Sequence, residues 1–327
     1  MNWFGFTLAA AFALFTGFND AGALVGLGLR LSARGLPPMP AVALLAVAAT
    51  VVPLVLGTAV AATLGERLIG GPAVDPRTTT SLTVAVTAAV LVTAVLAARG
   101  LPTSLTLALI GGIAGAGLGA GLGVDWPVVA TVLLTAAVAP CVGALAALGV
   151  HRLLATVPAY EGAGRRLRWL HAGALSMTCL AYGANDGQKM IAVYAAVQGG
   201  TAARYAASPL ALTTIGACFL VGGLIGLPRL AAALAGRLGT GRPDAALVTE
   251  LSGAGVVLGT AAFGAPVSMT QSLSGAMVGT GLTGGSRRVR WAGVLRLGRA
   301  WLLTLPTAFA VGAAGCLLAL AAGTAVR

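Results

Sequence analysis

Charged residues are scarce in this 327-residue sequence, where they make up 9% of the total. No polar stretch is long enough to fold as a soluble domain, which excludes a soluble globular protein. The cysteines lie in apolar stretches without CxxC or metal-ligand spacing, so no disulfide framework is expected. They are Cys141, Cys179, Cys218 and Cys316. A metal-ligand cluster, a Ser-His-Asp arrangement and a P-loop are also missing from the sequence, and we expect neither an enzyme nor a cofactor.

Almost all of the positive charge belongs to arginine. The 20 basic residues outnumber the 8 acidic ones, the formal charge is +12, and Lys189 is the single lysine. The arginines stand in short loops between apolar stretches, where the orientation of membrane helices explains them, so nucleic acid is not an expected partner. The two histidines, His151 and His171, stand at basic ends of such stretches and receive no role from the sequence.

Apolar residues dominate instead, since 58% of the chain is hydrophobic and the mean hydropathy is +0.95. A membrane-spanning helix needs roughly 20 mostly apolar residues, and about ten such stretches occur. We predict an all-α polytopic protein of the inner (plasma) membrane, with about 10–12 transmembrane or re-entrant helices. The segments are about 3–29, 39–64, 79–98, 101–123, 127–150, 169–198, 209–227, 245–262, 266–283 and 300–322. Either 101–123 or 266–283 could be a full span or a re-entrant hairpin.

The distribution of arginine predicts an orientation. If all ten segments cross the membrane and the chain starts outside, the inner loops collect 15 arginines and the outer loops four. The positive-inside rule then places both termini outside. Each half, 1–150 and 151–327, contributes five crossings, so the second half starts on the side opposite to the first. Any repeat between the halves must therefore be inverted.

Two motifs recur in the same order in the two halves. Gly-x-Asn-Asp occurs at 17–20 and 183–186, and Pro-x-Ser-x-Thr occurs at 102–106 and 266–270. The aspartate and the serine are 84 positions apart in the first half and 82 in the second. Inverted repeats with broken helices and a binding site at the membrane midplane are typical of secondary transporters.

The motif residues have the chemistry of an ion path. A carboxylate near the bilayer centre costs at least a few kcal/mol, so carboxylates there usually face a wet cavity or the bundle interior. Glycine followed by Asn-Asp favours a helix break, which frees N–H groups for an anion and carbonyl oxygens for Na⁺ or a proton. Hydroxyls beside the first N–H groups of a helix suit tetrahedral oxyanions.

These arguments give two overlapping sets of candidate residues. The candidates for substrate binding are Asn19, Asp20, Ser104, Thr106, Asn185, Asp186, Lys189, Ser268 and Thr270. The candidates for cation coupling are Asn19, Asp20, Asn185, Asp186 and Glu250.

Simpler interpretations stay open. A single Asn-Asp pair could be an interhelical hydrogen-bonding pair, and Lys189 could neutralise Asp186 instead of binding an anion. Glu250 could be an interfacial residue as well as a proton or cation ligand. Glycines at four-residue spacing predict close helix packing. These glycines are Gly111, Gly115, Gly119 and Gly123.

At these motifs the sequence resembles the PiT family of inorganic phosphate transporters. That family carries Gly-x-Asn-Asp and a Pro-Val-Ser-Thr-Thr-His-type element in each half, an acidic position before the second element, and a closing Trp-x-x-x…Trp-x-x-Thr-x-Pro stretch. Here the acidic position is Glu250, and the closing stretch runs from Trp291 to Trp301 and Pro306. The resemblance covers nearly the whole chain, and 183–189 is its most specific segment.

The resemblance implies a secondary active transporter that imports inorganic phosphate by symport with Na⁺ or H⁺. The implied partners are phosphate and the lipid bilayer, and a homodimer is compatible with a lipid-embedded bundle. The sequence departs from the family pattern at 104–107 and 268–271, where each half lacks one hydroxyl and one imidazole, and at Tyr182, which replaces a histidine. Sulfate or another tetrahedral oxyanion is therefore the alternative substrate.

Overall fold

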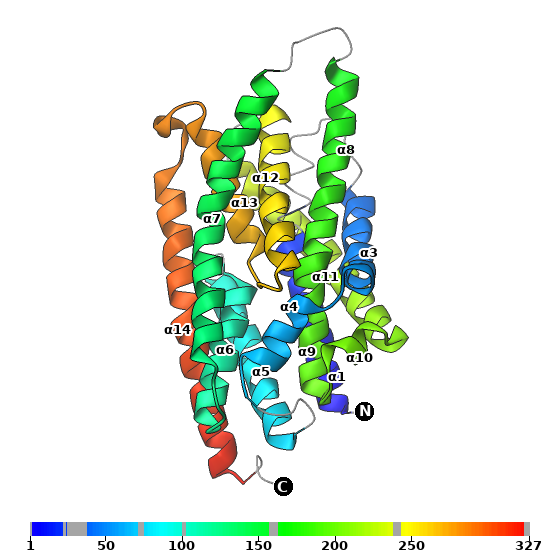
Figure 1. Cartoon of the computed structure of the whole chain (residues 1–327), viewed down its shortest axis with the longest axis vertical. Coiled ribbons are helices and arrows are strands. Elements are labelled where there is room, and N and C mark those ends of the chain that lie inside the picture. The colour runs from blue at the N-terminus through cyan, green and yellow to red at the C-terminus, as the bar shows by residue number, and fades with distance from the viewer. Residues whose placement is uncertain are drawn as a thin grey trace.

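The computed structural model describes residues 2–21, 24, 38–70, 75–99, 103–156, 163–237 and 243–323, and almost all of them are helical (Figure 1). The α-helices are α1 (Trp3–Thr16), α3 (Pro38–Leu56), α4 (Ala59–Ala62), α5 (Pro76–Ala98), α6 (Leu105–Gly119), α7 (Trp126–Ala155), α8 (Ala163–Tyr182), α9 (Gln188–Gln198), α10 (Ala202–Ala206), α11 (Pro209–Arg237), α12 (Pro243–Ala262), α13 (Met269–Leu282) and α14 (Trp291–Ala321). Three π-helical turns are η1 (Gly17–Ala21), η2 (Thr63–Arg67) and η3 (Gly183–Gly187), and η4 (Ser286–Arg288) is a short 3-10 helix. The predicted all-α class is confirmed.

Six helices within the described ranges are long and apolar enough to cross a membrane. They are α3, α5, α7, α11, α12 and α14. In Figure 1, α1 begins and α14 ends at one end of the molecule, whereas α7 ends and α8 begins at the opposite end. The chain is therefore a multi-pass membrane protein.

The helices α6 and α13 are too short to span a bilayer. They have 15 and 14 residues, or about 22 Å at 1.5 Å per residue, against roughly 30 Å of hydrocarbon. The Thr106 hydroxyl in the first turn of α6 donates to the carbonyl of Val267, just before α13, so the two helices begin together. From there they run to opposite ends of the molecule (Figure 1). The re-entrant alternative for these two segments therefore holds, and their antiparallel course is that of inverted repeats.

Each re-entrant helix packs against a long helix of the other half. α6 lies along α14, and α13 lies along α7. Glycine permits the close approach, because a Cβ atom on Gly115 would lie 2.0 Å from the carbonyl oxygen of Phe309, and one on Gly275 would lie 1.9 Å from that of Pro140. Gly111 and Gly119 contact α14 in the same way, so the predicted packing role is confirmed for three glycines. It is wrong for Gly123, which has open space beside it.

The glycines of the two Gly-x-Asn-Asp motifs also contact helices of the opposite half. A Cβ atom on Gly17 would lie 2.1 Å from the carbonyl oxygen of Phe219 on α11, and one on Gly183 would lie 2.3 Å from that of Ala48 on α3. Each Asn-Asp segment is thus held against a helix of the opposite half. The two halves are interlocked by small-residue packing at four places.

We expect Gly115→Ala to lower the apparent melting temperature of the purified protein in detergent. The added methyl group meets backbone that cannot move without separating α6 from α14, and overpacking of this kind costs typically 1–3 kcal/mol. The matched control is Gly149→Ala on α7, where the methyl group meets nothing within 4 Å. Equal melting temperatures for the two variants would contradict the close α6–α14 packing.

Candidate ion and substrate site

Both Asn-Asp pairs lie on π-helical turns. η1 continues α1, and η3 joins α8 to α9, so the predicted break of the helix takes the form of a widened turn within it. A π turn interrupts the α-helical hydrogen-bond ladder, and such turns occur frequently at functional sites. The glycine that opens each turn allows a helix of the other half to approach, as described above. The turn therefore aims the Asn and Asp side chains into the interior of the bundle.

Asn185 fixes the backbone directly before α13. Its Nδ2 donates to the carbonyl of Val267 at 2.7 Å, and its Oδ1 accepts from the Val267 N–H at 3.2 Å. The same Nδ2 donates to Asp186 Oδ2 at 2.9 Å. Asn185 is completely buried. Its amide thus satisfies both polar backbone groups of the residue that precedes Ser268.

Lys189 joins three segments at one point. Its Nζ lies 2.7 Å from Asp186 Oδ1 and 2.7 Å from Thr106 Oγ1, and it also donates to the Val267 carbonyl. An ammonium group has three donors, so all of them are used. The sequence left two roles open for Lys189, neutralisation of Asp186 and direct binding of an anion. The structure contains the contact that the first role requires, the ion pair with Asp186. Lys189 also links η3 to the starting points of α6 and α13.

Asp20 from the first half meets Tyr182 from the second. Its carboxylate accepts from Asn19 Nδ2 at 2.8 Å and from the Tyr182 hydroxyl at 3.2 Å. Tyr182 stands four residues before Asp186, at the end of α8 that leads into η3. Sequence reasoning gave Tyr182 no role, although its place directly before Gly183 was a signal. The Asn-Asp residues of both halves therefore converge on one region.

The two Ser/Thr elements are helix starts, as the sequence predicted, but they differ. Ser104 caps α6 by accepting from the Leu107 N–H at 3.3 Å. Ser268 makes no such cap, and its hydroxyl pairs with the Thr270 hydroxyl at 2.9 Å. The first-turn N–H groups of α13 are therefore not occupied by the serine. Such groups favour an anion.

Acidic side chains outnumber basic ones in this region. Two carboxylates, Asp20 and Asp186, stand against the single ammonium of Lys189, and all three side chains are at least nine-tenths buried. Within the described ranges no group of three or more His, Cys, Asp and Glu side chains could hold a metal ion. Oxygen atoms of Asn and Asp are instead ligands for Na⁺ or partners for a proton.

Glu250 does not join this set. It lies on α12 beside His171, with 3.6 Å between its Oε2 and the imidazole Nδ1. His171 stands 14 residues before Asn185 on the same helical rod, which corresponds to about 20 Å. The sequence grouped Glu250 with the Asn-Asp residues, whereas the fold separates them.

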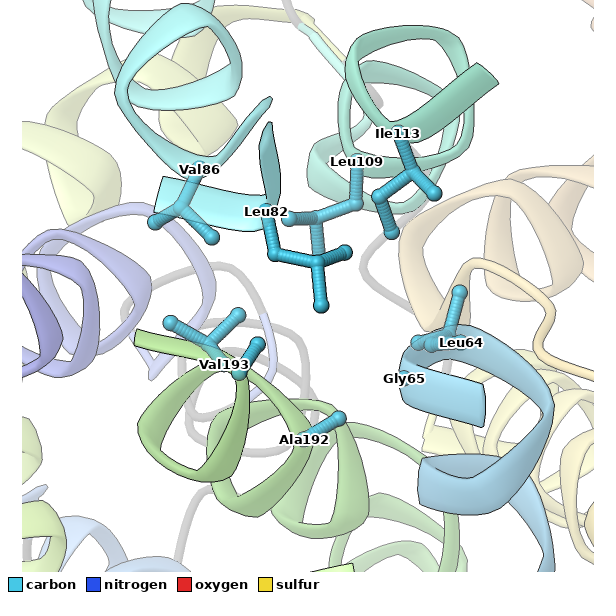
Figure 2. A pocket seen from close by; sticks show the side chains of 9 residues that line it. Leu64, Gly65, Leu82, Val86, Leu109, Ile113, Ala192 and Val193 are labelled. Carbon is cyan, nitrogen blue, oxygen red and sulfur yellow. The ribbon is translucent and has the colours of Figure 1, made fainter. Parts of the chain in front are cut away.

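An apolar cavity lies one helical turn beyond Lys189 and Thr106. Figure 2 shows side chains of η2, α5, α6 and α9 that point toward it. The cavity measures about 10 Å³, which is room for about one water molecule. Its lining consists of Leu64, Gly65, Leu82, Val86, Leu109, Ile113, Ala192, Val193 and Ala196. Packed apolar side chains therefore close the bundle on this side of the polar region.

Interlocked inverted repeats, with re-entrant helices that meet beside buried carboxylates, are an arrangement typical of membrane transporters. The comparison with known families agrees: the chain belongs to the phosphate transporter family, whose pattern matches residues 16–170 and again 155–312. This is a family of transporters and not of enzymes. The double match corresponds to the two repeats.

Similar proteins are found among mycobacterial transporters. The chain is 34% identical over 191 residues to a "probable low-affinity inorganic phosphate transporter" of Mycobacterium leprae, with 57% of this chain and 46% of the relative covered. It is 31% identical over 152 residues to a phosphate permease of Mycobacterium bovis, with 45% and 27% covered. The chain thus spans about half the length of the curated relatives it matches. The solved structure titled "The sodium-dependent phosphate transporter" has the same fold, with a TM-score of 0.81, 19% identity and 98% of each chain covered.

We expect Lys189→Met to lower the apparent melting temperature strongly, because it leaves Asp186 buried without its cation. Removal of one partner of a buried ion pair costs about 3–5 kcal/mol. The double variant Asp186→Asn with Lys189→Met should recover most of the loss, because no isolated charge is left. Thermal unfolding in detergent measures both. A single variant as stable as the double variant would rule out this ion pair as a structural link.

Proposed function

We propose that the protein is a secondary active transporter that imports inorganic phosphate across the plasma membrane by symport with a cation, Na⁺ or H⁺. The observation that carries the proposal is the position of Lys189, which connects Asp186 to the starts of both re-entrant helices. Family membership and the names of the mycobacterial relatives support phosphate as the substrate. In this proposal both termini lie outside, and the repeats divide near residue 150.

The anion binds between the starts of α6 and α13. The first-turn N–H groups of α13 donate to its oxygens, and the hydroxyls of Ser268 and Thr270 lie beside them. Thr106 and Ser104 contribute from the opposite repeat. Lys189 Nζ donates to Thr106 Oγ1. A bound oxyanion replaces this hydroxyl oxygen as the acceptor of that N–H group and is stabilised by the positive charge of the ammonium.

The need for a cation follows from the charges. Phosphate brings a charge of about −1 to −2 into a region where two carboxylates face one ammonium. Like charges so close in a low-dielectric site repel by several kcal/mol unless they are neutralised. A cation held by Asn19, Asp20, Asn185 and Asp186 removes this repulsion, so cation and anion bind together. Binding of the two as a unit is what symport requires.

Movement of one repeat against the other then alternates access to the site. The starts of α6 and α13 lie where the repeats meet, so a small rotation changes the surroundings of the anion. The helices α5, α6 and α9, which line the apolar cavity of Figure 2, lie toward the end of the molecule where α1 begins and α14 ends (Figure 1), which is the outer side in this proposal. The arrangement described here is then closed to the outside. A homodimer remains a prediction from the sequence.

Sulfate is the second candidate substrate. It is also tetrahedral, and the site has fewer hydroxyls than the family pattern. Competition distinguishes the two: excess unlabelled sulfate should leave the uptake of labelled phosphate unchanged if phosphate is the substrate, and should suppress it if sulfate binds equally well.

The test of function is uptake of labelled phosphate by proteoliposomes with and without a Na⁺ or pH gradient. Saturable, concentrative and cation-dependent uptake is expected for the wild type. Asp20→Asn removes one carboxylate, so phosphate binding should depend less on Na⁺ or acid pH, and concentrative uptake should fall more than binding does. Wild-type cation dependence in this variant would show that the carboxylate is structural.

Ser268→Ala should raise the half-saturation concentration for phosphate roughly tenfold or more, because loss of one buried hydrogen-bonding group costs about 1–3 kcal/mol. Ser176→Ala is the matched control, since this serine lies on α8 and bonds the Ala172 carbonyl at an exposed position. If half-saturation is the same in both variants, the Ser/Thr element of α13 serves packing and not binding.

A further inference from the structure

A second pair of buried ionisable side chains lies outside the site described above. His171 on α8 is 7% exposed and Glu250 on α12 is 4% exposed. The imidazole Nδ1 lies 3.6 Å from the carboxylate Oε2, and neither ring nitrogen nor this oxygen has a hydrogen-bond partner among the described residues. Buried polar groups without partners cost free energy. The free-energy cost of burying the pair therefore depends on whether the pair carries a proton.

Among the side chains that the structure describes, few other titratable groups lie on the helices around the pair. α8 packs mainly against α12, α3 and η3, and α12 packs mainly against α8, α13, α7, η3 and α4. Beyond the pair, the titratable side chains that the structure describes on these elements are Cys141, His151, Arg152, Cys179, Tyr182 and Asp186. The side chains of 163–168 and 243–244 lie outside the described ones. No described cation other than His171 comes within ion-pair distance of Glu250.

We propose that the His171–Glu250 pair is a proton-binding site. Without the proton, a neutral imidazole and a carboxylate leave a net charge of −1 between two mostly apolar helices. Uptake of one proton from water gives either an imidazolium beside a carboxylate or a neutral imidazole beside a carboxylic acid, and both forms have no net charge. The same proton returns to water when the pair releases it.

The position of the pair connects it to the substrate site. From His171, α8 leads through η3 to Asp186, and from Glu250, α12 leads into the loop whose Val267 is bound by Asn185. A net charge buried in the α8–α12 contact attracts water and weakens the contact, whereas the protonated pair allows the helices to pack. Proton binding thus stabilises the closed form of α8 against α12, on the side where α7 ends and α8 begins. The link to transport rests on the proposed function.

A direct test uses histidine NMR on the purified protein, because the chain has two histidines and His151 serves as the internal reference. The proposal predicts that the pH dependence of the His171 signal changes when Glu250→Gln removes the carboxylate. The His151 signal should not change. If the His171 signal follows the same pH course with and without the Glu250 carboxylate, the pair is a static contact and the proposal is wrong. This measurement does not depend on phosphate transport.

The pH profile of phosphate uptake provides a second test of the proposal. His171→Gln and Glu250→Gln should each flatten the pH profile of phosphate uptake by proteoliposomes, and His151→Gln should keep the wild-type profile. The titration of phosphate itself is the same for all variants and cancels. The exchanged double variant, His171→Glu with Glu250→His, should restore the profile, and it carries the test if a single variant does not fold. Wild-type profiles in both single variants, or no restoration in the exchanged variant, would overturn the proposal, whereas absence of uptake in the wild type would overturn only the proposed function.

Discussion

One buried ammonium group determines the arrangement of the polar region. Lys189 is the only lysine of the chain and is 3% exposed, so its three N–H donors must all be satisfied by protein groups. They are satisfied by Asp186 in η3, Thr106 in α6 and Val267 before α13. Because the three acceptors belong to three segments, a single side chain sets where both re-entrant helices begin. In lipid the alternative is an unpaired charge, which makes the arrangement strongly specified.

Features with a local cause could be predicted from the sequence. Apolar length predicts the spans, serine before an apolar run predicts the starts of α6 and α13, and glycine at four-residue spacing predicts close helix packing without indicating the partner helix. The Asn-Asp pairs were identified because carboxylates are costly in lipid, and the fold does bring Asp20 to Tyr182, four residues before Asp186. In each case the physical reason lies within one segment or in its copy in the other half.

Contacts that depend on the rotation of one helix against another could not be predicted. The Tyr182–Asp20 and Asn185–Val267 hydrogen bonds join residues 162 and 82 positions apart. Glu250 precedes the second Ser/Thr element in the sequence, but α12 sets it beside His171, which stands 14 residues before Asn185. The π-helical form of the Asn-Asp segments was missed too, since glycine in a helix is compatible with a break, a kink or a widened turn.

Each re-entrant helix packs against a long helix of the other half, and this has a consequence for how the protein is made. α6 is synthesised before α14, whose backbone fills the glycine face of α6. Among the described helices made before α14, α5 packs most extensively along α6, and the start of α6 has no ammonium to bind before Lys189 is made. The first repeat cannot reach its final packing ahead of the second. The tight contact between α6 and α14 thus forms only after both Asn-Asp segments have been synthesised.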